Sequence, residues 1–269
     1  MVDRRKTEAK SSLIGDDLAS FISQSKAGQL RLGRNQVFSY PQRYGGEGLM
    51  TVKIIACEVM KEELLGIIPK DHVEYEFIPM KLHLYPHKLH KELQDILDGS
   101  LGYSKIIMAF GLCGGAIKNL KATDSPLIIP RVHDCLPLLL GSKTAYQELA
   151  KEEIGTFYLS CGWMISEKNI LSSHQRVLEK YGEKKALRVL ERTYDSYKKV
   201  LFIHTGCAEE EPAIQQAKEI ATLLKLRYDT VQGNKSYLEK IVNGPWEEDD
   251  FAHIPPFEAI EEELFGIGI

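Results

Sequence analysis

The chain has 269 residues, of which 43% are hydrophobic and 27% are charged, so a fibrous protein, a miniature scaffold and a wholly disordered chain are excluded. A net charge of -4 provides no overall attraction for nucleic acid or for an anionic membrane. No apolar stretch approaches the roughly 20 residues that a membrane-spanning helix needs.

The first half of the chain is predicted to contain an extension and one α/β lobe. Residues 1–49 lack sustained periodicity and end in the breaker-rich stretch 40–46, which indicates a partly mobile N-terminal extension. Residues 50–164 then alternate short apolar runs with segments of helical pattern, which is typical of a first α/β lobe. The strands predicted in this lobe are 52–57, 73–78, 105–110, 127–130 and 155–160.

Residues 165–269 are predicted to form a helical connection followed by a second α/β lobe. The polar segment 165–185 is broken at Tyr181-Gly182 and separates the two groups of strands. A helix is predicted over 186–199, where apolar residues recur at spacings of three and four. A second helix is predicted over 212–224, because three glutamates and a proline at its start are favourable at a helix N-terminus. The remaining predicted strands are 200–204, 226–231 and 251–254.

This alternation predicts the fold class. Strands that alternate with helices form mainly parallel sheets with helices on both faces. We therefore expect an α/β protein of two unequal Rossmann-like lobes. In such sheets the ligand crevice lies at the carboxyl ends of the strands.

All five cysteines are predicted to lie at strand ends, close to that crevice. Cys57 ends the first strand and Cys161 ends the fifth, whereas Cys113, Cys135 and Cys207 follow the third, fourth and sixth. The N-terminus lacks the apolar stretch of a signal peptide, which favours a cytoplasmic protein with cysteines present as thiols. We expect several of these thiols to converge, although cysteine is also a common small core residue.

Converging thiols would favour a metal centre. Zinc is held by thiolate and imidazole, and His133, Cys135 and Cys207 provide one imidazole and two thiolates. An iron–sulfur cluster prefers thiolates, and Cys57, Cys113 and Cys135 could provide three, although compact cluster spacings are missing. The candidate metal ligands are thus Cys57, Cys113, His133, Cys135 and Cys207.

Several neighbouring residues are candidates for ligand contact or catalysis. The turn containing Gly111, Gly114 and Gly115 follows a strand and could present backbone amides to an anion, which Arg131 could also bind. A tight strand-to-helix turn is at least as good an interpretation of these glycines. Glu58, next to Cys57, could act as a base or support a ligating histidine.

Two further groups are interpreted without a functional role. The histidines at positions 83, 87 and 90 are spaced as on one helix face, but Pro86 separates the first of them from that helix. We interpret them as solvated side chains. Trp163 is interpreted as a core residue.

The motifs in this chain resemble those of an uncharacterised domain-of-unknown-function family of anaerobic archaea and bacteria, whose genes tend to accompany corrinoid-dependent methyltransferase systems. The resemblance covers roughly residues 51–256 and implies methyl metabolism without assigning a catalytic residue. The pattern His133-x-Cys135 with a distant Cys207 is also similar to that of zinc enzymes that transfer methyl groups from corrinoid proteins to a thiol, although those enzymes are larger barrels. The motifs that carry the family resemblance are Ala56-Cys57-Glu58, Gly111-Leu112-Cys113-Gly114, Arg131-Val132-His133-Asp134-Cys135, Gly141-Ser142-Lys143 with Tyr146, and Gly155-Thr156-Phe157-Tyr158-Leu159 with Gly162-Trp163.

Three functional hypotheses follow. The leading one is a metal-thiolate protein of anaerobic, corrinoid-linked methyl metabolism, in which Cys57, Glu58 and Cys207 are the catalytic candidates and a small anion is oriented by Arg131. The second is a metal-free racemase-like enzyme that uses two opposed cysteines, Cys57 or Cys113 with Cys207. The third is a non-catalytic accessory module for a corrinoid protein or a methyltransferase. The sequence leaves open whether the protein is an enzyme.

Overall fold

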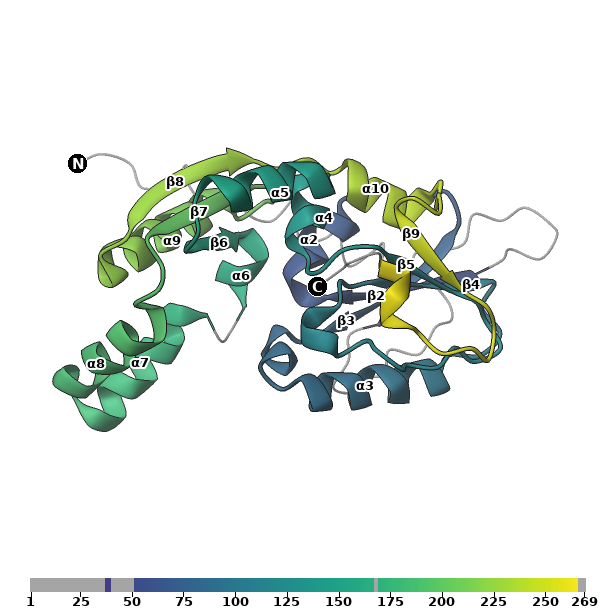
Figure 1. Ribbon diagram of the computed structural model, residues 1–269, viewed down its shortest axis with the longest axis horizontal. Helices are drawn as coiled ribbons and strands as arrows, with labels where there is room; N and C mark the ends of the chain where they lie inside the picture. The colour runs from purple at the N-terminus through teal and green to yellow at the C-terminus, as the bar shows by residue number, and fades with distance from the viewer. Residues whose placement is uncertain (1–36, 40–50, 167–168, 266–269) are drawn as a thin grey trace, which may run out of the picture. The chain divides into compact units, whose positions relative to one another are not determined.

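The computed structural model describes residues 37–39, 51–166 and 169–265, and its main sheet has six strands in the order β1-β3-β2-β4-β5-β9 (Figure 1). The four central strands are parallel, whereas β1 and β9 are antiparallel to their neighbours. Apart from β1, the predicted extension 1–49 lies outside the described residues. The strands are β1 (Val37–Ser39), β2 (Thr51–Cys57), β3 (His72–Ile78), β4 (Lys105–Ala109), β5 (Leu127–Pro130) and β9 (Phe251–Ile254).

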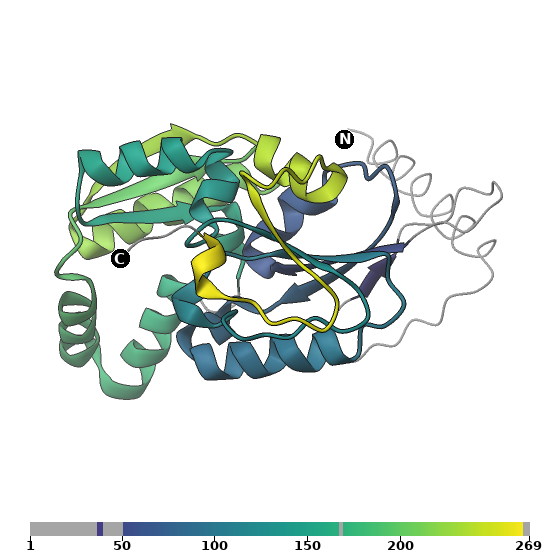
Figure 2. The same cartoon turned by 45° about the vertical axis from the view of Figure 1, so that its right-hand side comes forward.

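Helices cover both faces of this sheet, which explains why its central strands are apolar on both sides. In β2 every residue from Val52 to Cys57 except Lys53 is apolar, and all six are buried. Helix α3 (Pro86–Asp98) begins with proline at its first turn and buries Leu89, Leu93 and Leu97, which lie four residues apart on one face. Figures 1 and 2 both show α3 on one side of the sheet and α2 (Lys61–Leu65) and α10 (Ser236–Asn243) on the other.

A second sheet has three parallel strands in the order β6-β7-β8: β6 (Thr156–Ser160), β7 (Lys199–His204) and β8 (Arg227–Gln232). Helix α9 (Glu210–Leu224) packs against β7 and buries Ala217 and Ile220 in a core that includes Val200 and Phe202. The other helices are α4 (Leu136–Leu140), α5 (Lys143–Glu152), α6 (Cys161–Ile165), α7 (Ile170–Tyr181) and α8 (Glu183–Tyr194), with short 3-10 turns η1 (Glu58–Met60), η2 (Met80–Leu84), η3 (Cys113–Gly115) and η4 (Glu262–Phe265).

The predicted fold class is confirmed: the protein is a mixed α/β structure with mainly parallel, Rossmann-like sheets. Each predicted strand is present, with ends that differ by at most one residue. The predicted break at Gly182 is the boundary between α7 and α8, where this glycine has φ 79°. The helix predicted over 186–199 ends earlier, at Tyr194.

Two strands pair differently from the prediction. Strand 155–160 was predicted in the first lobe, but β6 pairs with β7 of the second sheet. Strand 251–254 was expected with the second group of strands, but β9 pairs antiparallel with β5 of the main sheet. Helix α10 precedes it and contacts α4 and α2, so the chain returns to the first sheet after β8. Within the described residues, no helix has both the length and the apolar character needed to span a bilayer.

Candidate functional site at the carboxyl edge of the main sheet

Three free cysteines follow adjacent parallel strands at one edge of the main sheet. Cys57 is the last residue of β2, Cys113 lies in the turn after β4, and Cys135 caps α4 after β5. Because β2, β4 and β5 are neighbours in the sheet, their carboxyl ends bring the three thiols to one region.

Cys57 is buried and Cys113 and Cys135 are half-buried, and the three thiols lie close enough to influence one another electrostatically. Burial is the main cause that raises the pKa of Cys57, and charge on Cys113 raises it further. Burial likewise raises the pKa of Cys113 to about 12 and places that of Cys135 well above its usual range, where Cys57 and Cys113 also contribute. The cluster is therefore protonated at neutral pH unless a cation or another partner replaces the protons.

Glycine at position 111 allows the turns after β4 and β5 to approach each other. A Cβ added to Gly111 would lie 2.5 Å from the carbonyl carbon of His133 and closer still to the Asp134 nitrogen. The turns are joined by hydrogen bonds from the Leu112 and Cys113 amides to the Val132 and His133 carbonyl oxygens, each 3.2 Å long. These contacts connect the chain segments that carry Cys113 and Cys135.

The η3 turn has an unusual backbone conformation. Cys113, Gly114 and Gly115 have φ values of 47°, 68° and 83°, so three successive residues are left-handed. Glycine adopts this conformation readily, whereas cysteine adopts it at an energetic cost. Gly114 and Gly115 are exposed, and nothing lies within 4 Å of the position that a Gly115 Cβ would occupy. The predicted glycine turn is thus present beside the thiols, with open space on its outer side.

His133 was predicted to be a metal ligand and Arg131 to bind an anion, but both lie in different surroundings from the thiols. His133 is exposed. The Arg131 Nε donates to the carbonyl oxygens of Glu248 at 2.8 Å and Phe251 at 3.2 Å. The Arg131 Nε therefore holds the segment that leads into β9. Arg131 was predicted to bind an anion, and this structural contact was not part of that prediction.

Glu58 acts in the structure as an acceptor that joins three segments. Its Oε1 accepts a hydrogen bond from the Met80 amide at 2.8 Å and from the Ser166 hydroxyl at 3.2 Å. Gly162 of α6 packs directly on the Val59 carbonyl oxygen, where a side chain would collide with the backbone. These contacts fix the chain that follows Cys57.

The sequence interpretation missed an acidic residue and a tyrosine beside Cys135. The Asp134 carboxylate accepts a hydrogen bond from the Leu136 amide at 2.8 Å and interacts with the Tyr146 hydroxyl. Burial is the largest cause that raises the Asp134 pKa, and burial followed by the Asp134 charge raises that of Tyr146 to about 12. An acidic residue between His133 and Cys135 was the available signal, but its contact with α5 was not visible in the sequence.

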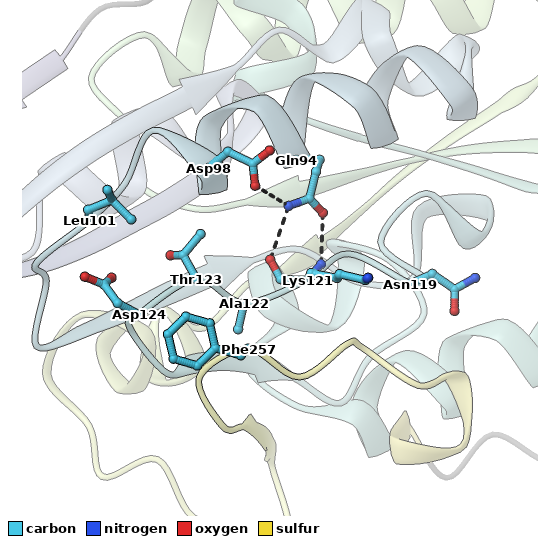
Figure 3. A pocket seen from close by; sticks show the side chains of 9 residues that line it. All are labelled: Gln94, Asp98, Leu101, Asn119, Lys121, Ala122, Thr123, Asp124 and Phe257. Atoms are coloured by element: carbon cyan, nitrogen blue, oxygen red, sulfur yellow. Dashed lines mark hydrogen bonds between the residues drawn. The ribbon is translucent and has the colours of Figure 1, made fainter.

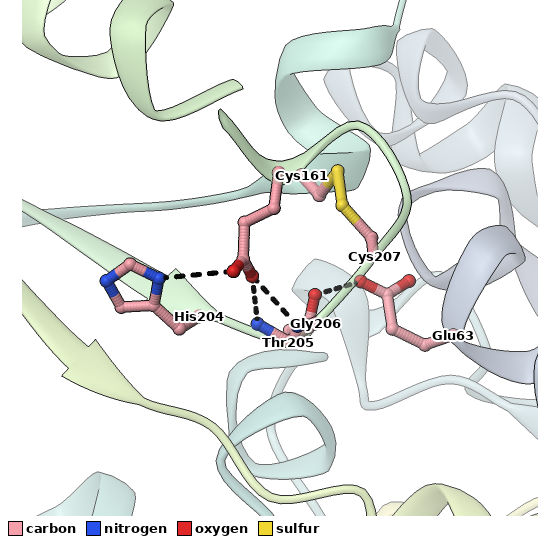
Figure 4. The surroundings of a disulfide bond; sticks show 7 residues. Glu63, Cys161, His204, Thr205, Gly206 and Cys207 are labelled. Carbon is pink, nitrogen blue, oxygen red and sulfur yellow. Dashed lines mark hydrogen bonds and ion pairs between the residues drawn. A yellow bond between two sulfur atoms is a disulfide. The ribbon is translucent and has the colours of Figure 1, made fainter. Parts of the chain in front are cut away.

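The prediction that all five cysteines are thiols is wrong for Cys161 and Cys207, which form a disulfide (Figure 4). Cys207 was expected to be a catalytic thiol and a metal ligand, yet its sulfur is bonded to Cys161 and is not a free thiolate. The reason is topological: β6 and β7 are adjacent and parallel, so Cys161 after β6 meets Cys207 after β7.

The chain around the disulfide is held by carboxylates. The Thr205 hydroxyl donates to Glu63 Oε1 at 2.6 Å, and Glu63 is only 1% exposed (Figure 4). The Thr205 and Gly206 amides both donate to Glu210 Oε1 at 2.8 Å. His204 Nδ1 lies 3.4 Å from the other Glu210 oxygen. The turn after β7 is thus bound to carboxylates from both α2 and α9.

His83 is not a solvated side chain, which corrects the sequence interpretation. Its Nε2 is buried without a hydrogen-bond partner among the described residues, and its ring stacks on Phe110 with 6.0 Å between centroids. Burial lowers the pKa of His83. His90 is half-buried with its Nδ1 2.9 Å from the Ala116 carbonyl oxygen, whereas His87 is exposed as expected. Trp163 packs against the cores beside both sheets, as predicted.

In residues 51–166 and 169–265, no group of three or more His, Cys, Asp or Glu side chains is arranged to hold a metal ion. An open pocket of about 630 Å³ lies at the opposite edge, before β4 and β5 (Figure 3). Its lining includes Leu101, Asp124 and the exposed Phe257. This pocket is separate from the cysteine cluster.

Comparison with known proteins identifies the family. The family described as "Protein of unknown function (DUF1638)" matches residues 77–242, which is more than half of the chain, and the chain belongs to this family. No curated protein and no solved structure matches it.

Proposed function

From the cysteine cluster at the strand ends, we propose that Cys57, Cys113 and Cys135 bind a thiophilic metal centre, either zinc or an iron–sulfur cluster. We further propose that the protein is cytoplasmic and serves corrinoid-linked methyl metabolism, in methyl transfer or in cofactor handling. The observation that carries the proposal is the gathering of three free thiols, one buried and two half-buried, from three adjacent strands, with raised pKa values that reflect both desolvation and mutual repulsion.

The electrostatics of the cluster favour a cationic ligand. Three thiolates buried together are unstable because each loses its hydration and repels the others. A metal cation removes that penalty and displaces the protons, so its binding releases protons and strengthens as the pH rises. Soft thiolate ligands favour zinc and iron–sulfur clusters over magnesium or calcium.

Binding would require local movement, because the described side chains are not set at metal-ligand positions. The η3 turn is suited to this movement. It is short and left-handed, and Gly114 and Gly115 are exposed, so open space lies on its outer side. Cys57 lies in a fully paired central strand and would change position least.

The link to methyl metabolism depends on the resemblance described above. A zinc-bound thiolate is deprotonated near neutral pH and can remain nucleophilic, which suits alkyl transfer. A corrinoid protein or its methyltransferase is the proposed partner. The small anion proposed for the site would contact the amide of Gly114, because the amide of Gly115 donates to the Leu112 carbonyl oxygen at 2.9 Å.

The racemase-like alternative has less support. It needs two opposed thiols with lowered pKa values, but burial raises the pKa of Cys57 and Cys113. Its third candidate, Cys207, is in the disulfide. We therefore do not propose a two-cysteine proton transfer for this protein.

The test is elemental analysis and absorption spectroscopy of the protein purified without oxygen. Stoichiometric zinc without colour supports a mononuclear site, and iron with a thiolate charge-transfer band supports a cluster. Cys135→Ser should abolish the metal, whereas the matched variant Cys161→Ser/Cys207→Ser should retain it. Metal-free protein that takes up neither zinc nor iron would overturn the proposal, and binding of a corrinoid protein by that metal-free form would favour an accessory module.

A further inference from the structure

The two cysteines of the disulfide differ in their exposure to solvent (Figure 4). Cys161 is 0% exposed and begins α6 within the core of the second sheet. Cys207 is half-buried in the turn after β7, and its chain neighbours Gly206 and Ala208 are exposed. Thiol–disulfide exchange begins at the sulfur that the attacking thiolate can reach, so an external thiol would attack Cys207 and release Cys161.

The turn that carries Cys207 is also held by hydrogen bonds that do not involve the disulfide. The Thr205 and Gly206 amides both donate to Glu210 of α9. The Thr205 hydroxyl donates to the buried Glu63 of α2. Opening the S–S bond removes one covalent link and leaves these contacts in place, so we expect the fold to persist when both cysteines are thiols.

Both segments that the disulfide joins contact residues 58–63, which directly follow β2. Helix α6 packs against η1, and Ser166 at the end of α6 donates to Glu58 at 3.2 Å. The turn after β7 contacts the other end of this stretch, where Thr205 donates to Glu63 at 2.6 Å. The disulfide therefore closes a ring of contacts that contains α6, residues 58–63 and the turn after β7.

We propose that Cys161–Cys207 is a reversible thiol–disulfide exchange site for a dithiol, and that its reduction loosens residues 58–63 next to the cysteine cluster. This inference rests on the cytoplasmic location proposed above, because cytosolic disulfides are usually transient and serve catalysis or redox sensing.

The exchange has two steps. The attacking thiolate bonds to the Cys207 sulfur while the S–S bond breaks, and the released Cys161 thiolate takes up a proton. The second thiol of the dithiol then displaces Cys207, which is also protonated. The dithiol is oxidised to its own disulfide, and the protein gains two electrons and two protons.

The first test uses dithiothreitol, added without oxygen or denaturant to the unaltered full chain. Reduction is followed as the rise from three to five alkylated thiols in samples quenched and then denatured. The rate should increase in proportion to the dithiothreitol concentration and exceed the rate of global unfolding. Oxidised dithiothreitol should restore the bond, with the circular dichroism of a folded protein throughout. A rate that never exceeds the unfolding rate would overturn the proposal, because the bond would then open only in unfolded chains.

A pair of matched variants identifies the sulfur that is attacked. Glutathione disulfide should modify Cys207 in Cys161→Ser at least about tenfold faster than it modifies Cys161 in Cys207→Ser, as measured by peptide mass spectrometry on folded protein. Equal rates, or faster modification of Cys161, would contradict the assignment of Cys207.

Hydrogen exchange tests the effect on residues 58–63. Reduction should speed exchange of the α2 amides at least about tenfold, whereas α3, on the other face of the main sheet, serves as the control and should not change. Unchanged exchange in α2 would overturn the coupling. The metal proposal is tested separately by the metal content of Cys161→Ser/Cys207→Ser, so failure of one proposal is distinguishable from failure of the other.

Discussion

Replacing Gly111 by alanine tests the close approach of the two turns that carry Cys113 and Cys135. The added methyl group would meet backbone atoms of His133 and Asp134 at 2.5 Å or less, and real Cβ atoms essentially never come within 3.0 Å of such neighbours. A flexible side chain could move aside, but a backbone segment cannot do so without changing the turn. The backbone conformation at Gly111 is not left-handed, so the effect comes from the contact alone.

The expected loss of stability can be bounded in two ways. If the turns stay together, overpacking costs about 1–3 kcal/mol. If they separate, the hydrogen bonds from the Leu112 and Cys113 amides are lost, at about 1 kcal/mol each. Both estimates give a loss of about 2 kcal/mol in the free energy of unfolding. For a chain of this size that corresponds to a fall in the unfolding midpoint of about 4–8 °C.

Thermal and urea unfolding followed by circular dichroism would measure this loss. Gly99→Ala is the matched control, because its added methyl group would lie 3.5 Å from the Asp95 carbonyl oxygen, an ordinary contact. The control should change the midpoint by less than about 2 °C or raise it slightly. If Gly111→Ala and Gly99→Ala unfold at the same temperature, the close contact described here does not limit the fold.

Three further predictions concern buried groups. Lys53 and Glu76 form a buried ion pair of 2.6 Å, so Lys53→Met should destabilise by about 3–5 kcal/mol in urea unfolding, whereas Lys53→Met/Glu76→Leu should be nearly neutral. The disulfide joins residues 46 apart, so reduction of Cys161–Cys207 should lower the unfolding free energy by about 4 kcal/mol and raise the thiol count of the denatured chain from three to five. Burial raises the pKa of Glu63 in the folded protein, so the fold loses stability as the pH rises above the pKa that Glu63 has in the unfolded chain. Glu63→Gln should therefore have a higher unfolding free energy than the unaltered protein at pH 7.5 but not at pH 4.

Much of the architecture was predictable because the strands are strongly apolar. The run from Val52 to Cys57 and the run 127–130 are buried on both faces, which is the pattern typical of parallel strands covered by helices on both sides. Strand ends are also where the sheet brings distant residues together. The placement of Cys57, Cys113 and Cys135 at one edge followed from that rule alone.

Strand order was the information that the sequence lacked. Cys207 follows a strand as Cys57 does, so the sequence could not distinguish pairing with the three free thiols from pairing with Cys161. The structure decides it, because β6 is the neighbour of β7 in the second sheet. The antiparallel pairing of β9 with β5 was hidden for the same reason: four apolar residues do not specify a partner strand.

Side-chain surroundings were a second limit. The spacing of His83 relative to Pro86 indicated that it precedes α3, but not that its ring packs on Phe110, which is 27 residues away. The contact between Asp134 and Tyr146 likewise joins the turn after β5 to α5. Such contacts depend on how elements pack, and local sequence pattern does not report packing.

The central position of β2 has a consequence for how the chain can be divided. Strands β3 and β4 each pair with β2 and not with each other, so without it they would be about 10 Å apart, twice the normal spacing of paired strands. The family match begins at residue 77 and ends at residue 242, and a fragment with those boundaries would lack β2, Cys57 and β9. During synthesis the edge of β5 that pairs with β9 stays exposed until residues 251–254 have left the ribosome, and an unpaired strand edge favours aggregation of the growing chain.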